Sequence, residues 1–98
     1  MNITIKTIHF NADKKLEKFV ETKLNKLKQY DDRILGANIS LKLVKNQDLE
    51  NKIAEIKLDI PGTDLFAKKQ TESFEKSTDT AIDALKKQLQ KFKEKQKQ

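Results

Sequence analysis

The chain has 98 residues, a net charge of +6 and no cysteine. Its length suits one domain, so we expect residues 1–98 to fold as a single unit. The absence of cysteine excludes a disulfide framework, and the longest apolar run is far too short to span a membrane. Because the N-terminus also lacks the pattern of a signal peptide, we expect a cytoplasmic protein that does not enter a membrane.

The first half of the chain predicts a strand, a helix and a second strand. Alternation of apolar and polar residues predicts a strand over residues 2–8. Asn11 or Asp13 can cap a helix that runs to about Tyr30. The apolar stripe of this helix consists of Leu16, Phe19, Val20, Leu24 and Leu27. After Gly36, the buried face of a second strand consists of Ala37, Ile39, Leu41 and Leu43.

The second half predicts two further strands and a long final helix. A turn at residues 46–48 precedes a third strand, whose apolar residues are Ala54, Ile56, Leu58 and Ile60. A turn at residues 61–62 leads to a short fourth strand that starts at Leu65. Thr71 or Ser73 can cap the final helix. Its apolar stripe consists of Phe74, Thr78, Ala81, Ile82, Leu85, Leu89 and Phe92.

These elements predict an α+β fold. The helix between the first two strands forms a crossover, so these strands should be parallel and adjacent. The short turns that follow should make the remaining strands antiparallel neighbours. Each helix is apolar along one stripe only, so both should cover the same face of the sheet. We therefore expect the order β-α-β-β-β-α, a four-stranded mixed sheet, two helices packed on one face, and frayed residues 95–98.

The sequence offers little for catalysis or for binding a cofactor. His9 is the only histidine, and we expect it at a strand end or on the surface rather than as a ligand. Gly36 and Gly62 are the only glycines, so there is no glycine-rich phosphate loop. Several acids lie in the predicted turns, where solvated acids are ordinary: Asp31, Asp32, Asp48 and Glu50. We expect a binding protein and not an enzyme, without a metal, a cofactor or a small-molecule substrate.

The excess positive charge lies almost entirely at the C-terminal end. Residues 1–83 contain 15 basic and 14 acidic residues, a net charge of +1. Residues 84–98 contain six lysines and one acid, Glu94, a net charge of +5. A dense positive charge of this kind favours a polyanionic partner, and RNA phosphates are the partner that we expect.

On a helical wheel the lysines of both helices group into lines. One flank of the first helix carries only basic charges, from Lys15, Lys18, Lys23 and Lys26. In the last helix two lines flank the apolar stripe: Lys87, Lys91 and Lys95 on one side, and Lys86, Lys93 and Lys97 on the other. Like charges four residues apart cost a helix about a few tenths of a kcal/mol. The lines therefore favour a phosphate-binding ridge, although cations at a helix C-terminus also suit a solvated helix end.

The composition favours recognition of RNA through its backbone. The chain has 20 lysines and one arginine, Arg33, and lysine binds phosphate as a flexible point charge. We therefore expect backbone charge and RNA shape to lead the binding. Tyr30 and Phe66 could stack on a base, but we expect both to be packing residues.

Two stretches of the sequence resemble one known family. The stretch from Leu16 to Ile34, LEKFVETKLNKLKQYDDRI, resembles the first helix of ribosome hibernation promoting factors. These are also called ribosome-associated inhibitors or sigma-54 modulation proteins. The stretch from Thr80 to Lys95, TAIDALKKQLQKFKEK, resembles their second helix. The predicted element order is also that of the family, and the resemblance implies a fold similar to a double-stranded-RNA-binding domain.

The resemblance also implies a function and the residues that carry it. Members of the family bind the small ribosomal subunit at the decoding region, where they block mRNA and the A- and P-site tRNAs in starved or stationary cells. The chain would then be a stress-response factor that regulates translation, is monomeric when free, and has the small subunit and its rRNA as partners. The RNA-binding residues carried over by position are Lys23, Lys26, Arg33, Lys87, Lys91, Lys93 and Lys95. Lys86 is added from the helical wheel.

Three features depart from the pattern of the family. The last helix begins with Ser73, Phe74 and Glu75 instead of an Asp-Met-Tyr-like turn, so a contact made by that tyrosine would be missing. Position 84 is alanine where relatives often carry lysine, and Lys86 can compensate. The chain stops at residue 98, without the C-terminal domain with which long members pair ribosomes, and so resembles the short type.

Two alternative functions remain open from the sequence. One is a protein-binding modulator of a transcription factor, as the older family name implies. Such a role should bury apolar surface, and the sequence shows no obvious spare apolar patch. The other is a general binder of double-stranded RNA, which should bind free duplex RNA as well as it binds ribosomes.

Overall fold

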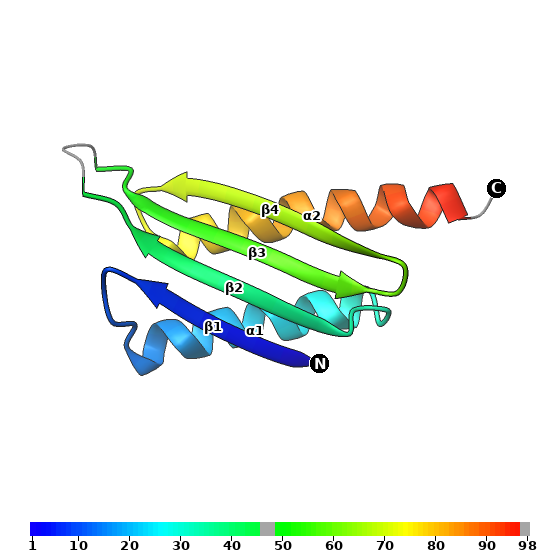
Figure 1. Ribbon diagram of the computed structural model, residues 1–98, viewed down its shortest axis with the longest axis horizontal. Helices are drawn as coiled ribbons and strands as arrows, with labels where there is room; N and C mark the ends of the chain where they lie inside the picture. Colours follow the sequence, from blue (N-terminus) through cyan, green and yellow to red (C-terminus); the bar gives the residue numbers. More distant parts are fainter. Residues whose placement is uncertain (46–48, 97–98) are drawn as a thin grey trace.

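The elements of the computed structural model follow the predicted order. The structure describes residues 1–45 and 49–96, with the backbone alone at 95 and 96, so the turn predicted at residues 46–48 lies outside the described residues. The strands are β1 (Asn2–Ile8), β2 (Gly36–Leu43), β3 (Lys52–Ile60) and β4 (Thr63–Thr71). The helices, labelled in Figure 1, are α1 (Lys14–Tyr30) and α2 (Phe74–Gln96).

The four strands form one mixed sheet in the order β1-β2-β3-β4. β1 and β2 are parallel, with Ile5 opposite Ile39. β3 is antiparallel to both of its neighbours, with Ile56 opposite Ile39 on one side and Ala67 on the other. The predicted topology is therefore confirmed, and α1 is the crossover that the parallel pair requires.

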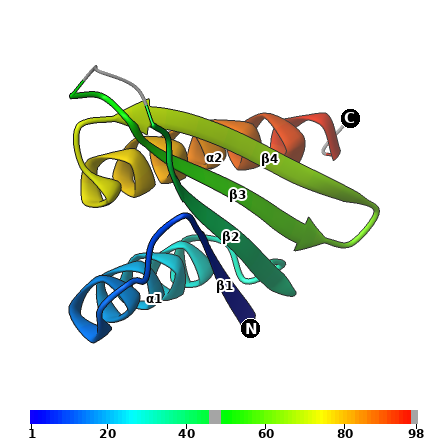
Figure 2. The ribbon, with the colours of Figure 1, turned by 60° about the vertical axis from the view of Figure 1, so that its left-hand side comes forward.

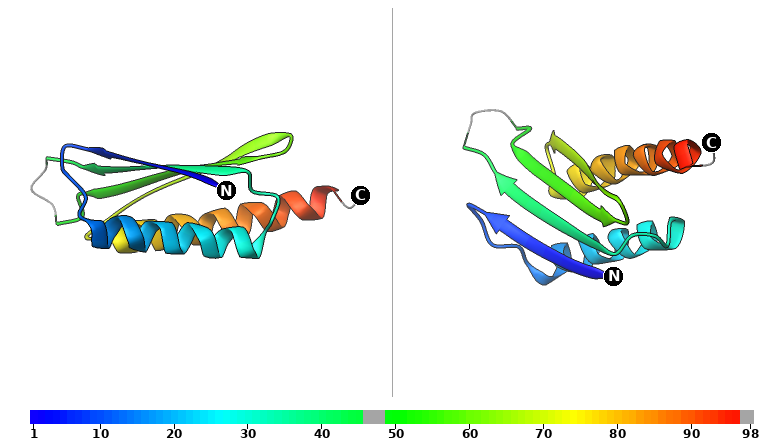
Figure 3. Two further views of the ribbon diagram at one scale, coloured as in Figure 1. Left: turned by 90° about the horizontal axis from the view of Figure 1, so that it is seen from below. Right: turned by 45° about the vertical axis from the view of Figure 1, so that its right-hand side comes forward.

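Both helices lie on one face of the sheet, as the left view of Figure 3 shows. α1 lies behind β1 and β2, and α2 lies behind β3 and β4 (Figures 1 and 2). Their apolar stripes meet the inward-facing strand residues in one core. The most deeply buried large side chains are Val20, Leu24, Leu27, Ile34, Ile39, Leu41, Ile56, Leu58, Leu85 and Leu89. Within the described part of the chain, neither helix is long and apolar enough to cross a membrane.

The other face of the sheet is open to solvent. Phe66 lies on this face because its neighbours Leu65 and Ala67 point towards the helices. Its side chain is exposed, so the expectation that Phe66 packs against the protein is wrong. The charged groups beside it form the ion pairs Lys57–Asp64 and Lys68–Glu55.

A side-chain cap fixes the start of α1. The backbone N–H of Leu16 donates to Oδ1 of Asp13 over 2.8 Å, so Asp13, and not Asn11, is the cap. At the other end, the N–H of Asp31 donates to the carbonyl of Leu27 over 3.0 Å, while the backbone of Asp31 itself is extended. The predicted bounds of this helix are confirmed.

Hydroxyl groups fix the start of α2. Ser73 Oγ accepts a hydrogen bond from the N–H of Lys76 over 3.1 Å, which confirms Ser73 as the cap. Thr71 Oγ1 lies 2.7 Å from Ser77 Oγ, which donates to the carbonyl of Lys52 over 2.6 Å. This chain of hydrogen bonds ties the first turn of α2 to β3 and β4, and so sets where the helix crosses the sheet.

The fourth strand is longer than predicted. β4 starts at Thr63, two residues before Leu65, and has nine residues. Gly62 adopts a φ of +89°, a conformation that glycine reaches without strain. The turn is therefore tight enough to place Thr63 directly opposite Ile60, and pairing continues up to the turn.

The end of α2 is helical where fraying was expected. The helix continues to Gln96, and its last turn extends past the β3–β4 turn in Figure 1. Apart from Phe92, residues 86–96 are all strong helix formers. The ring of Phe92 packs against the core and lies under the guanidinium of Arg33, which anchors this part of the helix. Residues 97–98 lie outside the described residues.

Candidate nucleic-acid interface

A groove lined by lysines runs between α2 and β4. Lys87 and Lys91 lie one turn apart on α2, and Lys69 comes from β4. The groove is shallow, with a volume of about 510 Å³. Among the described residues that line it, Asp83 is the only acid, and the others are Thr80, Ala84 and Gln88. We call this feature the outer lysine groove.

Contacts between α2 and the edge strand hold the outer lysine groove in shape. Gln88 Nε2 donates to the backbone carbonyl of Phe66 over 2.8 Å, which attaches the helix to β4. Lys69 lies on a strand, so the helical lines of lysines in the sequence did not indicate it as a candidate. Its signal was present: side chains alternate along a strand, so Lys69 shares the helix-covered side of β4 with Leu65 and Ala67.

Lys23 lies between the two helices. Its ammonium group is 3.1 Å from Oδ1 of Asp79 on α2 and 5.5 Å from the centre of the Phe19 ring. A partly exposed ion pair of this kind contributes about 0–1 kcal/mol to stability, so its main effect is to hold the side chain in place. The other lysines of the same flank are exposed: Lys15, Lys18 and Lys26.

Arg33 is oriented by the carboxylate of Asp31. Its Nε donates to Oδ1 over 2.9 Å and its Nη2 donates to Oδ2 over 2.6 Å, which makes a bidentate pair. The guanidinium also lies 5.3 Å from the centre of the Phe92 ring on α2. The hydrogen bond from the Arg33 side chain lowers the pKa of Asp31, and the charge of Lys93 adds to this effect. Arg33 thus joins the loop after α1 to the end of α2.

The Asp31–Arg33 pair should appear in the pH dependence of stability. Because the folded state lowers the pKa of Asp31, the pair stabilises the fold above the ordinary aspartate pKa of about 4, and this stabilisation disappears as the pH falls through the lowered value. We expect Asp31→Asn to be less stable than the wild type at neutral pH, with a difference that shrinks below about pH 4. Urea unfolding over a pH series measures this difference. The difference in stability between Arg33→Gln and the wild type should shrink over the same pH range. A difference in stability that does not change with pH would contradict the assignment.

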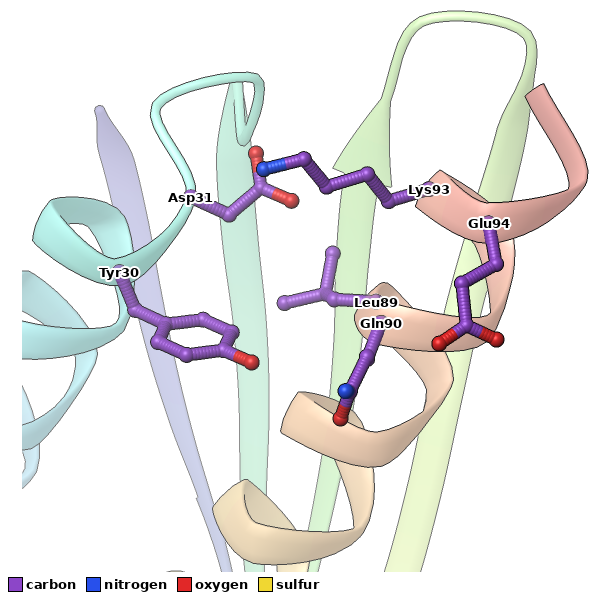
Figure 4. A pocket seen from close by; sticks show the side chains of 6 residues that line it. All are labelled: Tyr30, Asp31, Leu89, Gln90, Lys93 and Glu94. Atoms are coloured by element: carbon purple, nitrogen blue, oxygen red, sulfur yellow. The ribbon is translucent and has the colours of Figure 1, made fainter. Parts of the chain in front are cut away.

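A pocket of about 340 Å³ lies between the end of α1 and the C-terminal half of α2. Figure 4 shows the Tyr30 ring pointing from α1 towards α2, and the Lys93 side chain extending towards Asp31. Lys86 Nζ lies 5.7 Å from the centre of the Tyr30 ring. We call this feature the interhelical pocket; its lining residues are Tyr30, Asp31, Leu89, Gln90, Lys93 and Glu94. Tyr30 is exposed, so the expectation that it packs against the protein is wrong.

The predicted RNA-binding residues fall into two groups. One lines the outer lysine groove: Lys87 and Lys91. The other lies in or beside the interhelical pocket: Lys93 lines it, Lys86 contacts the Tyr30 ring, and Arg33 lines an adjoining pocket together with Lys93. Lys23 is held by Asp79, and Lys26 stands exposed on α1. Lys95 continues α2, and its side chain lies outside what the structure describes.

The single histidine directly follows β1 and is exposed, at the kind of position that the sequence indicated. The backbone of His9 adopts a φ of +69°, a left-handed conformation that is uncommon for residues other than glycine. In the described ranges 1–45 and 49–96, no three side chains of His, Cys, Asp or Glu lie close enough together to hold a metal ion.

Curated proteins similar to this chain share one description. The Pseudomonas putida ribosome hibernation promoting factor is 31% identical over 96 residues, which cover 98% of this chain and 90% of that protein. The Deinococcus radiodurans ribosome hibernation promotion factor is 34% identical over 80 residues. That match covers 80% of this chain but 41% of the relative, so the chain matches less than half the length of the Deinococcus protein.

Solved structures share the fold. A ribosomal subunit interface protein from Coxiella burnetii superimposes with a TM-score of 0.85 at 24% identity, covering 95% of this chain and 98% of that one. The N-terminal domain of Thermus thermophilus Protein Y superimposes with a TM-score of 0.78 at 28% identity, covering 94% and 99%. Residues 3–97 match the sequence profile of one family. The chain therefore belongs to the family described as Sigma 54 modulation protein / S30EA ribosomal protein.

Proposed function

We propose that this chain binds the small ribosomal subunit at its decoding channel through lysine–phosphate contacts and thereby blocks mRNA and tRNA. The observation that carries the proposal is the outer lysine groove, in which Lys69, Lys87 and Lys91 converge from two elements. Three ammonium groups around one groove suit the closely spaced phosphates of folded RNA. The protein acts in the cytoplasm, by occupying space and not by catalysis.

The remaining candidate residues extend this surface across both helices. α1 and α2 lie on one face of the sheet, so their solvent-exposed sides point the same way and a single RNA can contact both helices. Lys26 is exposed on α1, Lys86 contacts the Tyr30 ring, and Lys93 lines the interhelical pocket and lies beside Arg33. The proposed RNA-binding residues are Lys23, Lys26, Arg33, Lys69, Lys86, Lys87, Lys91, Lys93 and Lys95.

The descriptions of similar proteins support the ribosome as partner. The relatives from Pseudomonas putida and Deinococcus radiodurans are ribosome hibernation factors, and the Coxiella burnetii protein is a ribosomal subunit interface protein. This chain covers 90% of the Pseudomonas factor, which supports carrying the same role over to it. In this role the free protein is a monomer, and rRNA is the part of the subunit that it contacts.

Binding to the small subunit should depend steeply on salt. If about six lysines neutralise phosphates, the logarithm of the affinity should fall with the logarithm of the salt concentration with a slope of about −5. Co-sedimentation of the purified chain with small subunits over a salt series measures this slope. A slope near zero would overturn a mechanism led by phosphate contacts.

Competition experiments locate the site on the subunit. Bound tRNA should reduce co-sedimentation of the chain, and the chain should in turn release tRNA. Free duplex RNA in excess should compete weakly; if it competed as well as small subunits do, the protein would be a general double-stranded-RNA binder. Simultaneous binding of tRNA and the chain at full occupancy would exclude the decoding channel.

A further inference from the structure

Tyr30 presents an exposed aromatic ring where the two helices meet. It is the last residue of α1 and is 53% exposed, whereas Val20, Leu24 and Leu27 of the same helix are fully buried. Tyr30 is therefore not part of the hydrophobic core. Lys86 of α2 places its ammonium group 5.7 Å from the ring centre, within the range of a cation–π contact. The ring and the cation thus form a joint surface that neither helix has alone.

The ring forms one side of the interhelical pocket (Figure 4). Leu89 and Gln90 of α2 line the pocket with it, which adds an apolar contact and an amide that can both donate and accept hydrogen bonds. The volume of about 340 Å³ lies at the lower end of the range of small-ligand sites. A single planar ring system of modest size therefore suits this pocket better than a large cofactor.

The charges of the pocket do not suit a phosphate group alone. Glu94 and Asp31 line it together with Lys93, and Asp31 already pairs with Arg33. The carboxylate of Glu94 would repel a phosphate but accepts N–H groups. The outer lysine groove has three lysines and one acid among its described lining residues, and is the better phosphate site. The outer lysine groove therefore suits the phosphates of an RNA, and the interhelical pocket suits another part of the same RNA.

We propose that the interhelical pocket binds one unpaired RNA base, stacked on the ring of Tyr30, with neighbouring phosphates on Lys86 and Lys93. Aromatic rings beside lysines are the ordinary means of holding unstacked bases of single-stranded RNA. The inference rests on the proposed function, because it takes RNA as the partner, and it adds an unpaired nucleotide to the phosphate-led contacts. The binding surface would thus recognise an unpaired base as well as the charge of the RNA backbone.

The carboxylate also gives the pocket a base preference. Cytosine carries an amino group, a hydrogen-bond donor, where uracil carries a carbonyl acceptor, and the two rings have the same size. Glu94 accepts from the amino group but repels the carbonyl oxygen. An oligocytidine should therefore bind better than an oligouridine of equal length, which has the same number of phosphates.

Tyrosine fluorescence reports directly on this site. The chain has one tyrosine and no tryptophan, so its intrinsic fluorescence comes from Tyr30. Titration with oligocytidine should quench this fluorescence to saturation, because the base stacks on the ring. Two controls lack bases: an abasic oligomer of equal length, and inorganic polyphosphate. Neither should quench more than a small part of the Tyr30 fluorescence. Equal quenching by the abasic oligomer, or no quenching by oligocytidine at saturation, would overturn the proposal.

Substitution of the ring provides the second measurement. Tyr30→Ala should weaken binding of labelled oligocytidine by about five-fold to a hundred-fold, the usual range for loss of one stacked base. Tyr30→Phe should retain the affinity. Phe66→Ala is the matched control, because Phe66 is 54% exposed but lies on the opposite face of the sheet, and it should bind as the wild type does. An equal loss in Tyr30→Ala and Phe66→Ala would overturn the assignment.

The failure of this proposal can be told apart from failure of the proposed function. One outcome is that the wild type binds small subunits with a steep salt slope, while Tyr30→Ala binds oligocytidine as well as the wild type does. This outcome would refute the base pocket and leave phosphate-led ribosome binding intact. Absence of small-subunit binding by the wild type would refute the proposed function, whatever Tyr30 does.

Discussion

Replacing Lys87 and Lys91 with glutamate should weaken binding to the small ribosomal subunit by at least about a hundred-fold at physiological salt. Two phosphate contacts, each with a salt slope of about −0.9, account for about a thirty-fold loss at 0.15 M salt. The two introduced carboxylates add repulsion of the same phosphates. The salt slope should also become less steep by about 2. Co-sedimentation over a salt series measures both quantities.

The control for this variant changes the same net charge on the opposite side of the molecule. Lys6 and Lys42 lie on the open face of the sheet, because their neighbours Ile5 and Leu41 face the core. The double variant Lys6→Glu and Lys42→Glu should lose only a few-fold in affinity. If both double variants lost affinity equally, general attraction of a basic protein to RNA would explain the binding, and the outer lysine groove would not.

Leu85→Ala should lower the free energy of unfolding by about 2–5 kcal/mol. Leu85 is fully buried on the stripe of α2 that packs on the sheet, so its removal leaves a cavity in the core. A domain of this size is stable by about 5–15 kcal/mol, and the melting temperature should fall by about 10–30 °C. Thermal and urea unfolding measure the change. Because α2 carries most of the candidate RNA-binding lysines, binding should fall in parallel once the variant begins to unfold.

Leu49→Ala is the matched control for this core substitution. It deletes the same atoms from a side chain that is 85% exposed, so we expect a change within about 0.5 kcal/mol. Similar losses in both leucine variants would mean that packing of α2 on the sheet does not hold the fold together.

The strands and helices could be predicted from the sequence because their patterns depend on residues that are close together in the chain. Side-chain direction has a period of two in strands and 3.6 in helices, so the buried positions of α2 and of β3 follow from spacing alone. The parallel pairing of β1 and β2 follows from the helix between them, and the antiparallel pairs follow from short turns. The length of β4 did not follow, because it depends on the +89° φ of Gly62 and on pairing with Ile60, which local composition does not specify.

The candidate site could be predicted only in part from the sequence. The lines of Lys87 with Lys91 and of Lys86 with Lys93 follow from helical spacing, and the structure retains both. Lys69 joins the first line only because β4 is the edge strand next to α2. Asp79 reaches a lysine of α1 only because the two helices lie side by side. Contacts between segments distant in sequence carry no local periodic signal.

The sequence by itself determined the elements, the buried faces and the accumulation of positive charge on α2, because periodicity and charge are properties of neighbouring residues. The tertiary structure alone decided how that charge is used. It separated the lysines into an outer groove with Lys69 and an interhelical pocket with Tyr30, and it engaged Lys23 and Arg33 with carboxylates. The physical reason is that the packing of both helices on one face of the sheet determines which lysines meet and which acids stand beside them.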